Sequence, residues 1–233
     1  MIGASSAALA LVWGVVSTAQ GANEQAKFAP VPISRARGVC VTGSGLVPRW
    51  DGAPHPDCQV SWAELGQLGG ERALYEGRYV WASPEFPAYK VVSVIVYERT
   101  NSGEVVTPLL ALSQDETHVF LKEVHLRTVG SMHFVEVRQC LNGTGGCWQE
   151  FYKWSPGGLS KVAPSIDEQV RRLVPSGYRI NKGARVNLEA MSGEVGLWLE
   201  SDPNCCPSAS MRFSLSWTPA GFIIPRSEVT SSK

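Results

Sequence analysis

Two cysteines that bracket a short glycine-rich segment place the tightest constraint on how this chain folds. Cys140 and Cys147 enclose the residues LNGTGG, and a hairpin that turns at the centre of this segment sets them opposite each other. Facing residues on antiparallel strands lie close enough for a disulfide. The same register pairs Val135 with Tyr152. Because the turn and the pairing agree, the sequence predicts an antiparallel hairpin with a Cys140–Cys147 bridge.

Further segments have the composition of β-strands. They are rich in β-branched and aromatic residues and are separated by Gly, Asn, Ser or Pro turns. We expect strands at 79–81, 90–99, 105–112, 119–127, 133–139, 148–154, 184–188, 195–200, 211–217 and 222–224. Pro108 predicts an edge position or a bulge in its strand. The sequence therefore predicts a mostly β fold of antiparallel sheets, sandwich-like or two-lobed, with disulfides and two short helices.

The two helices are predicted from their first turns. The pattern Ser-Trp-Ala-Glu that begins at Ser61 is a capping box, and it predicts a helix near 62–68 that ends at two glycines. Ser165 can cap a second helix near 166–173. One apolar stripe of that helix would consist of Ile166, Val170 and Leu173. If the domain has two lobes, this second helix divides them near residues 164–176.

The N-terminus has the features of a signal peptide. The apolar run AALALVWGVVSTA is followed by small residues that allow cleavage before Gln20 or before Ala22. No basic residue precedes the run, and an uncleaved anchor is the alternative. The sequence thus predicts a signal peptide over 1–21, a polar lead-in prone to disorder over 22–37, and a β-rich exported domain over 38–233. The expected location is periplasmic or secreted. No stable membrane span is expected after cleavage.

Export to an oxidising compartment favours disulfides for the other four cysteines as well. Cys40 and Cys58 flank a Gly- and Pro-rich loop, and a bridge between them would limit the freedom of that loop. Cys205 and Cys206 are then left with each other, in a small strained ring that is easily reduced. The alternative is that each of them bonds a distant cysteine. Scattered histidines and the lack of a CxxC pair argue against a zinc site.

The segment around the adjacent cysteines carries the one family resemblance. Asp202-Pro203-Asn204-Cys205-Cys206-Pro207-Ser208 precedes an alternating strand. It resembles the Asp-x-x-Cys-Cys-Pro-Ser turn of exported bacterial proteins of unknown role, among them small lipoproteins of the LppP/LprE type. The resemblance covers residues 198–217 and implies an exported β-rich protein, with no catalytic residue carried over. The chain lacks the lipid-bearing cysteine of the lipoprotein members.

Two further segments resemble each other within the chain. Residues 152–159 and 215–222 each contain a strand, a Trp, a Ser/Thr-Pro-small-Gly turn and an apolar return. The similarity indicates either two related halves or the same turn reached twice.

Composition narrows the function. Lys plus Arg and Asp plus Glu number 21 each, so a net-neutral chain has no long-range field that would attract nucleic acid. Ser44 lies in a Gly-Ser-Gly sequence that lacks the pattern of a hydrolase nucleophile. The sequence therefore predicts no cofactor and no metal, and it names no catalytic residue.

The function that the sequence favours is a non-enzymatic one. We expect an exported binding or envelope-associated protein with a protein, peptide or glycan ligand. Its candidate binding surface consists of Trp50, Trp62, Asp202 and Asn204. The alternatives are an inhibitor of an extracellular hydrolase that presents the loop 43–56, and an enzyme whose site is assembled from distant residues. The aromatic face formed by Trp148, Tyr152 and Trp154 is expected to be core rather than a binding strip.

Overall fold

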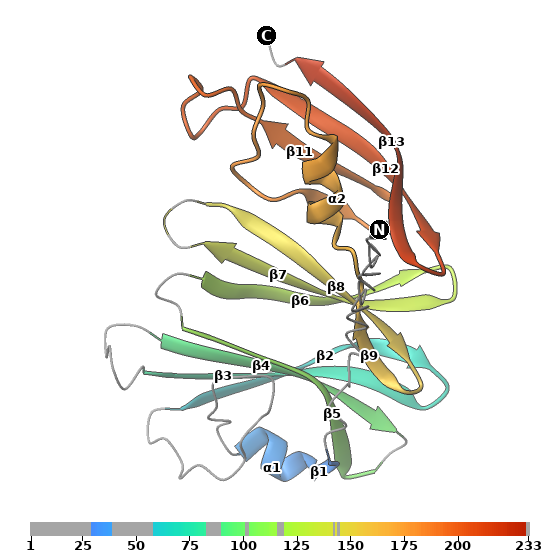
Figure 1. The fold of residues 1–233 in the computed structure, drawn as a ribbon. Coiled ribbons are helices and arrows are strands. Elements are labelled where there is room, and N and C mark those ends of the chain that lie inside the picture. Colours follow the sequence, from blue (N-terminus) through green and yellow to red (C-terminus); the bar gives the residue numbers. More distant parts are fainter. Residues whose placement is uncertain are drawn as a thin grey trace, which may run out of the picture.

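The fold consists of three antiparallel sheets, which we number I to III along the sequence. They are stacked in that order (Figure 1). The computed structural model describes residues 29–38, 58–82, 90–100, 103–115, 119–141, 143 and 145–231. The expectations for residues 1–21, Ser44, Cys40, Trp50 and the loop 43–56 lie outside the described residues. The predicted fold class, mostly β with antiparallel sheets and two short helices, is confirmed.

Sheet I holds the first five strands in the spatial order β1-β5-β4-β3-β2. The strands are β1 (Val31–Pro32), β2 (Gln59–Gly69), β3 (Arg72–Ala82), β4 (Lys90–Thr100) and β5 (Val105–Asp115). The central strand β4 is buried on both faces, which explains its nearly unbroken run of β-branched residues. The pairing of β4 with β5 shifts register next to Pro108, so the predicted irregularity is confirmed.

Sheets II and III are both four-stranded meanders in which spatial order follows chain order. Sheet II contains β6 (Val119–Val129), β7 (Met132–Leu141), β8 (Cys147–Ser155) and β9 (Gly158–Lys161). Sheet III contains β10 (Arg185–Asn187), β11 (Ser192–Leu197), β12 (Ala209–Thr218) and β13 (Gly221–Ser231). The helix α2 (Ile166–Leu173) connects the two sheets and lies against β13.

Three apolar cores hold the layers together. The core between sheets I and II is built from residues such as Leu74, Val94, Val135 and Val137. The core between sheet II, α2 and sheet III includes Phe134, Phe151, Val170, Met211 and Phe222. On the outer face of sheet I, the core around Tyr79 and Tyr97 packs against α1 (Ile33–Gly38). Neither helix of the described part is long and apolar enough to cross a membrane.

The hairpin predicted from the cysteine spacing is confirmed in detail. Cys140 faces Cys147 at the end of the β7–β8 pair, and Val135 faces Tyr152. The two Sγ atoms are 2.03 Å apart, and the Cα atoms are 4.0 Å apart. Tyr152 is buried in the core between sheets I and II, and Trp154 packs against that core. These two aromatic residues are therefore core, as expected.

The helix predicted near 62–68 is wrong, because this segment is strand β2. It pairs with β3 along nearly its whole length, and Gly69 and Gly70 form the hairpin turn with φ angles of +100° and +61°. Glu64 does not cap a helix, since its carboxylate instead accepts hydrogen bonds from the Gln67 side chain and the Tyr75 hydroxyl. Long-range strand pairing thus overrides a local capping pattern.

The second predicted helix is confirmed as α2. Ser165 and Glu168 form a reciprocal capping box, in which each side chain bonds the backbone of the other. Ile166 and Val170 are buried as expected, but Leu173 is 41% exposed because the last turn leaves the core. The lead-in contains more structure than predicted, since residues 31–38 form β1 and α1.

The internal similarity between 152–159 and 215–222 corresponds to two matching hairpin turns. In the first, the Ser155 hydroxyl donates to the Gly158 carbonyl at 3.3 Å. In the second, the Thr218 hydroxyl donates to the Gly221 carbonyl at 2.9 Å. Both glycines have positive φ, +120° and +115°, a region that favours glycine. The same turn closes the last hairpin of sheet II and the last hairpin of sheet III.

Candidate functional site

A polar hollow of about 770 Å³ lies between sheets II and III, and we call it the II/III cleft. The interface of these sheets is apolar around Phe134, Phe151 and Phe222. The cleft occupies the part of the interface that this core does not fill. Its wall on sheet II includes Glu123, Arg127, Glu136, Arg138, Cys147 and Gln149. Its opposite wall includes Lys182, Gly183, Ala184, Arg185, Glu194, Trp198, Cys205 and Pro207.

Strand alternation in β7 explains how side chains of one strand reach both the core shared with sheet I and the cleft shared with sheet III. Successive side chains of a strand point to opposite faces of the sheet. Val135 and Val137 point into the core shared with sheet I, whereas Phe134 points toward sheet III. Glu136 and Arg138 follow on the same face as Phe134 and line the cleft. A single strand therefore supplies an apolar anchor and a polar floor on one face.

The floor of the cleft is a hydrogen-bonded network centred on Glu136, whose side chain is only 6% exposed. One carboxylate oxygen of Glu136 lies 2.6 Å from Nε of Arg127. The other accepts a hydrogen bond from the Gln149 side-chain amide. The Gln149 carbonyl oxygen in turn accepts from the Val186 backbone N–H at 2.7 Å. Because a buried carboxylate needs such partners, this network fixes the floor and joins β8 to β10.

The segment Lys182–Ala184 forms part of the opposite wall and is held tightly from two sides. A Cβ atom on Gly183 would lie 2.1 Å from the Cys147 carbonyl oxygen, so only glycine fits at this approach. On the other side, the Asp167 carboxylate accepts a hydrogen bond from the Ala184 N–H at 3.0 Å. Burial raises the pKa of Asp167, although the Ala184 N–H and Arg171 partly oppose this rise.

The segment 199–208 that carries the adjacent cysteines is closed at both ends by one side chain. The Asp202 carboxylate accepts hydrogen bonds from the Leu199 N–H at 2.7 Å and from the Ser208 N–H at 3.0 Å. It also accepts from the Ser208 hydroxyl at 2.6 Å. Asp202 therefore has a structural role in shaping this loop, and Asn204 is exposed within it.

Cys205 and Cys206 are bonded to each other at the edge of the cleft. The alternative, in which each bonds a distant cysteine, is therefore wrong. Both residues are exposed, and Cys205 lines the cleft. Cys58 is also disulfide-bonded, while Cys40, its expected partner, lies outside the described residues.

Trp198 is the one large aromatic residue among the described residues that line the cleft. It is 3% exposed, and its ring stands over Gly196, where a Cβ atom would lie 2.6 Å from the indole. The Trp198 backbone pairs with Arg179 in both directions. Its buried indole N–H has no hydrogen-bond partner among the described residues. Most buried polar groups in proteins have a hydrogen-bond partner. The Trp198 indole N–H is therefore an unusual feature of this wall, a buried donor without an acceptor among the described residues.

The charges of the cleft divide into paired and unpaired groups. Arg127 pairs with Glu136, Arg138 lies 3.5 Å from Glu123, and Nε of Arg212 lies 3.6 Å from Glu194 beside the cleft. Lys182 and Arg185 form no salt bridge within the part of the chain that the structure describes. Among the described residues, the cleft therefore presents two cationic side chains that form no salt bridge.

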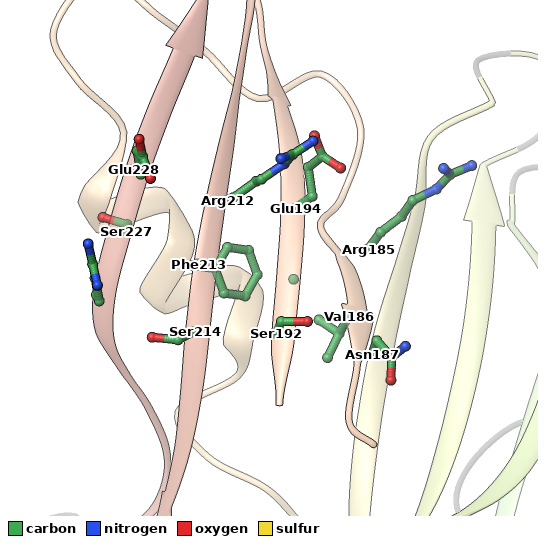
Figure 2. A pocket seen from close by; sticks show the side chains of 12 residues that line it. Arg185, Val186, Asn187, Ser192, Glu194, Arg212, Phe213, Ser214, Ser227 and Glu228 are labelled. Carbon is green, nitrogen blue, oxygen red and sulfur yellow. The ribbon is translucent and has the colours of Figure 1, made fainter. Parts of the chain in front are cut away.

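A second hollow, of about 530 Å³, extends the cleft over the outer face of sheet III. It shares Arg185, Val186 and Glu194 with the II/III cleft. The strand register places Arg185, Glu194, Arg212 and Glu228 in one row across the four strands, and Figure 2 shows these side chains in line. A row of alternating charge is typical of a solvated sheet face, and it makes the polar surface continuous from sheet II to β13.

Among the residues predicted as a binding surface, Trp50 lies outside the described residues, and Trp62 lies apart from Asp202 and Asn204. Trp62 belongs to the core on the outer face of sheet I, where its ring centroid lies 5.7 Å from that of Tyr75 and 5.0 Å from that of Tyr97. Asp202 and Asn204 lie near the cleft in the cysteine loop. Sequence patterns do not predict a place in the site for Lys182, Arg185 or Trp198. The only local signal is Gly183, which lies between Lys182 and the short strand β10.

No group of three or more His, Cys, Asp or Glu side chains within the described ranges is placed to hold a metal ion. No protein-family model, no curated protein and no solved structure matches this chain.

Proposed function

We propose that this protein is an exported, non-enzymatic binding protein that holds an acidic peptide or glycan in the II/III cleft. The observation that carries the proposal is the pair of unpartnered cations, Lys182 and Arg185, on the wall of a hollow of ligand-binding size. The lining is mostly polar and charged, so it favours a ligand with several polar groups over an apolar one. Carboxylates or sulfates on the ligand would give charge-assisted hydrogen bonds to these two cations.

The carboxylates of the cleft support binding over catalysis. Both oxygens of Glu136 are engaged, one by Arg127 and one by Gln149. Burial raises the pKa of Glu123, but Arg138, Lys122 and His125 outweigh this and leave the pKa lowered. A general acid needs a raised pKa and access to its substrate. Glu123 lacks the raised pKa, and the buried Glu136 lacks the access. An enzyme with an assembled site is therefore the weaker alternative.

The proposal places the protein outside the cytoplasm, in the periplasm or secreted. Its support is the signal-peptide pattern of residues 1–21 and the presence of disulfides, which persist in oxidising compartments. The resemblance of residues 198–217 to exported bacterial proteins points the same way.

The experiment is a binding titration with fluorescein-labelled hexaglutamate and with oligogalacturonate, against neutral oligoglucose and hexalysine as controls. We expect the acidic probes to bind and the Lys182→Ala/Arg185→Ala variant to lose at least about tenfold in affinity, since even one hydrogen bond to a charged group contributes roughly 1.5–3 kcal/mol. Binding by the wild type should also weaken with added salt.

A matched variant separates the cleft from bulk charge. Lys90→Ala/Arg172→Ala removes the same charge from exposed positions outside the cleft, and it should bind like the wild type. Equal losses in the two double variants would overturn the assignment to the cleft. Preference for the neutral glycan would overturn the acidic ligand class.

A further inference from the structure

The two disulfides that border the II/III cleft differ in their accessibility. Cys140 is 2% exposed and faces Cys147 between two paired strands. Cys205 and Cys206 are both exposed and lie in a loop. A thiol reaches a disulfide by direct attack on sulfur, so access is a precondition for exchange. Cys147 is half-buried, so the second of these disulfides is the more accessible one.

Sequence adjacency gives the second disulfide a further property. A bridge between neighbouring residues closes a small ring that contains a single peptide bond, and this ring restricts the backbone more than a bridge between separate strands does. Constrained, exposed disulfides are the ones that thiols reduce readily, whereas buried ones between strands resist reduction. The Cys205–Cys206 disulfide is therefore reduced more readily than the Cys140–Cys147 disulfide.

The loop is built so that it survives reduction. Asp202 holds Leu199 at one end and Ser208 at the other by three hydrogen bonds that do not involve either sulfur. Breaking the Cys205–Cys206 bond consequently frees the backbone only between these anchors. The change is local and can be reversed by oxidation without unfolding the sheet.

This local change occurs on the wall of the cleft. Cys205 lines the cleft together with Lys182 and Trp198. Pro207 follows directly and packs over Gly196, where a Cβ atom would lie 3.2 Å from its Cγ. The unpartnered indole N–H of Trp198 belongs to the same wall. Cationic neighbours favour the thiolate form of a reduced cysteine, and a thiolate here would compete with an acidic ligand for those cations.

We propose that Cys205–Cys206 is a reversible thiol–disulfide exchange site that regulates the II/III cleft. The reductant is a small-molecule thiol or a dithiol oxidoreductase. One thiolate attacks a sulfur of the pair, the S–S bond breaks, and the other cysteine leaves as a thiolate that takes up a proton. A second thiol resolves the mixed disulfide, which leaves two protein thiols and one external disulfide. The effect on ligand affinity, though not the exchange itself, rests on the proposed binding function.

The test is equilibration of the full mature protein in glutathione buffers of graded thiol-to-disulfide ratio, followed by acid quenching, alkylation and peptide mapping. We expect Cys205–Cys206 to reach half reduction at a thiol level at least about tenfold lower than Cys140–Cys147 requires. Far-ultraviolet circular dichroism should stay unchanged at that point. Reoxidation should restore the Cys205–Cys206 peptide in full.

Ligand binding provides the second measurement. The reduced wild type should bind hexaglutamate several-fold more weakly than the oxidised wild type. The Cys205→Ser/Cys206→Ser variant, which lacks the bridge but forms no thiolate, should bind more tightly than the reduced wild type. Reduction of both disulfides together, or only with unfolding, would overturn the exchange site. Selective reduction with unchanged affinity would overturn the regulation alone. Absence of hexaglutamate binding in every state, with selective reduction intact, would overturn the proposed function and its regulation while the exchange site stands.

Discussion

The two faces of sheet II show how one sheet serves two purposes. Its face toward sheet I meets an apolar core that includes Val135 and Val137. Its face toward sheet III is apolar at Phe134 and polar at Glu136 and Arg138. The first interface has a hollow of only about 310 Å³, where β2 and β3 meet β6, whereas the second has the II/III cleft of about 770 Å³. The difference shows that a site can be made in a layered β fold by leaving one interface incompletely filled, with the apolar part bearing the stability.

The largest effect should come from removing the apolar anchor of the second interface. Phe134 is fully buried against Phe222 and Trp217, and Phe134→Ala should destabilise the protein by about 3–5 kcal/mol through lost contacts and a cavity. Urea unfolding measures this change. Leu173→Ala, at an exposed apolar position, should cost less than about 0.5 kcal/mol. A cost below about 1 kcal/mol for Phe134→Ala would show that the interface is not held there.

The close approach of the two cleft walls gives a smaller effect. Gly183→Ala puts a methyl group against the Cys147 carbonyl, so we expect a loss of about 2–3 kcal/mol, because the backbone itself must move. Its matched control is Gly157→Ala, where a Cβ atom meets nothing closer than 3.7 Å and the stability should change by less than about 0.5 kcal/mol. Equal stability of the two variants would refute the tight junction.

The polar junction between β8 and β10 comes next. Gln149→Leu deprives the Val186 N–H of its acceptor and Glu136 of one donor, and it should cost about 1–2 kcal/mol, since water partly replaces these bonds. Hydrogen exchange at Val186 should accelerate, while exchange in β7 stays slow. Gln67→Leu, on the exposed edge of sheet I, serves as the control and should leave both readouts unchanged.

The smallest effect is a pH dependence located at Asp167. Burial raises the pKa of this carboxyl above its unfolded value of 3.8, so the folded state binds the proton more tightly and loses stability as pH rises from about 4 through the raised pKa. The slope is at most about 1.4 kcal/mol per pH unit. Asp167→Asn should abolish this slope. The measurement is the free energy of unfolding of the wild type and of Asp167→Asn between pH 3 and 7. The same pH dependence in both proteins would contradict the assignment to Asp167.

Local signals in the sequence predict the local parts of this fold. The Cys140–Cys147 hairpin and the capped helix α2 each depend on residues a few positions apart, and both are confirmed. The same kind of signal fails at Ser61–Glu64, because pairing with β3 depends on residues that a local pattern does not contain. Strand preferences are decided by neighbours across the sheet.

The cleft lies beyond what local signals can predict. Glu136 and Gln149 meet through the β7–β8 register, and Gln149 meets Val186 only because sheet III stacks on sheet II. Lys182 and Arg185 acquire a common wall with Cys205 by the same stacking. The adjacent cysteines are visible in the sequence, but the place of Cys205 on the same cleft wall as Lys182 and Arg185 is a property of the assembled layers.

The agreement between sheet order and chain order has a consequence for how the molecule is made. Within sheets II and III every strand pairs only with neighbours along the chain, and sheet I differs only in that β1 joins β5. Pairings over short sequence distances form quickly, because little loop-closure entropy opposes them. A chain that emerges N-terminus first can therefore complete each layer on the one before it. The cleft is then the last feature to form, which delays ligand binding until assembly is complete.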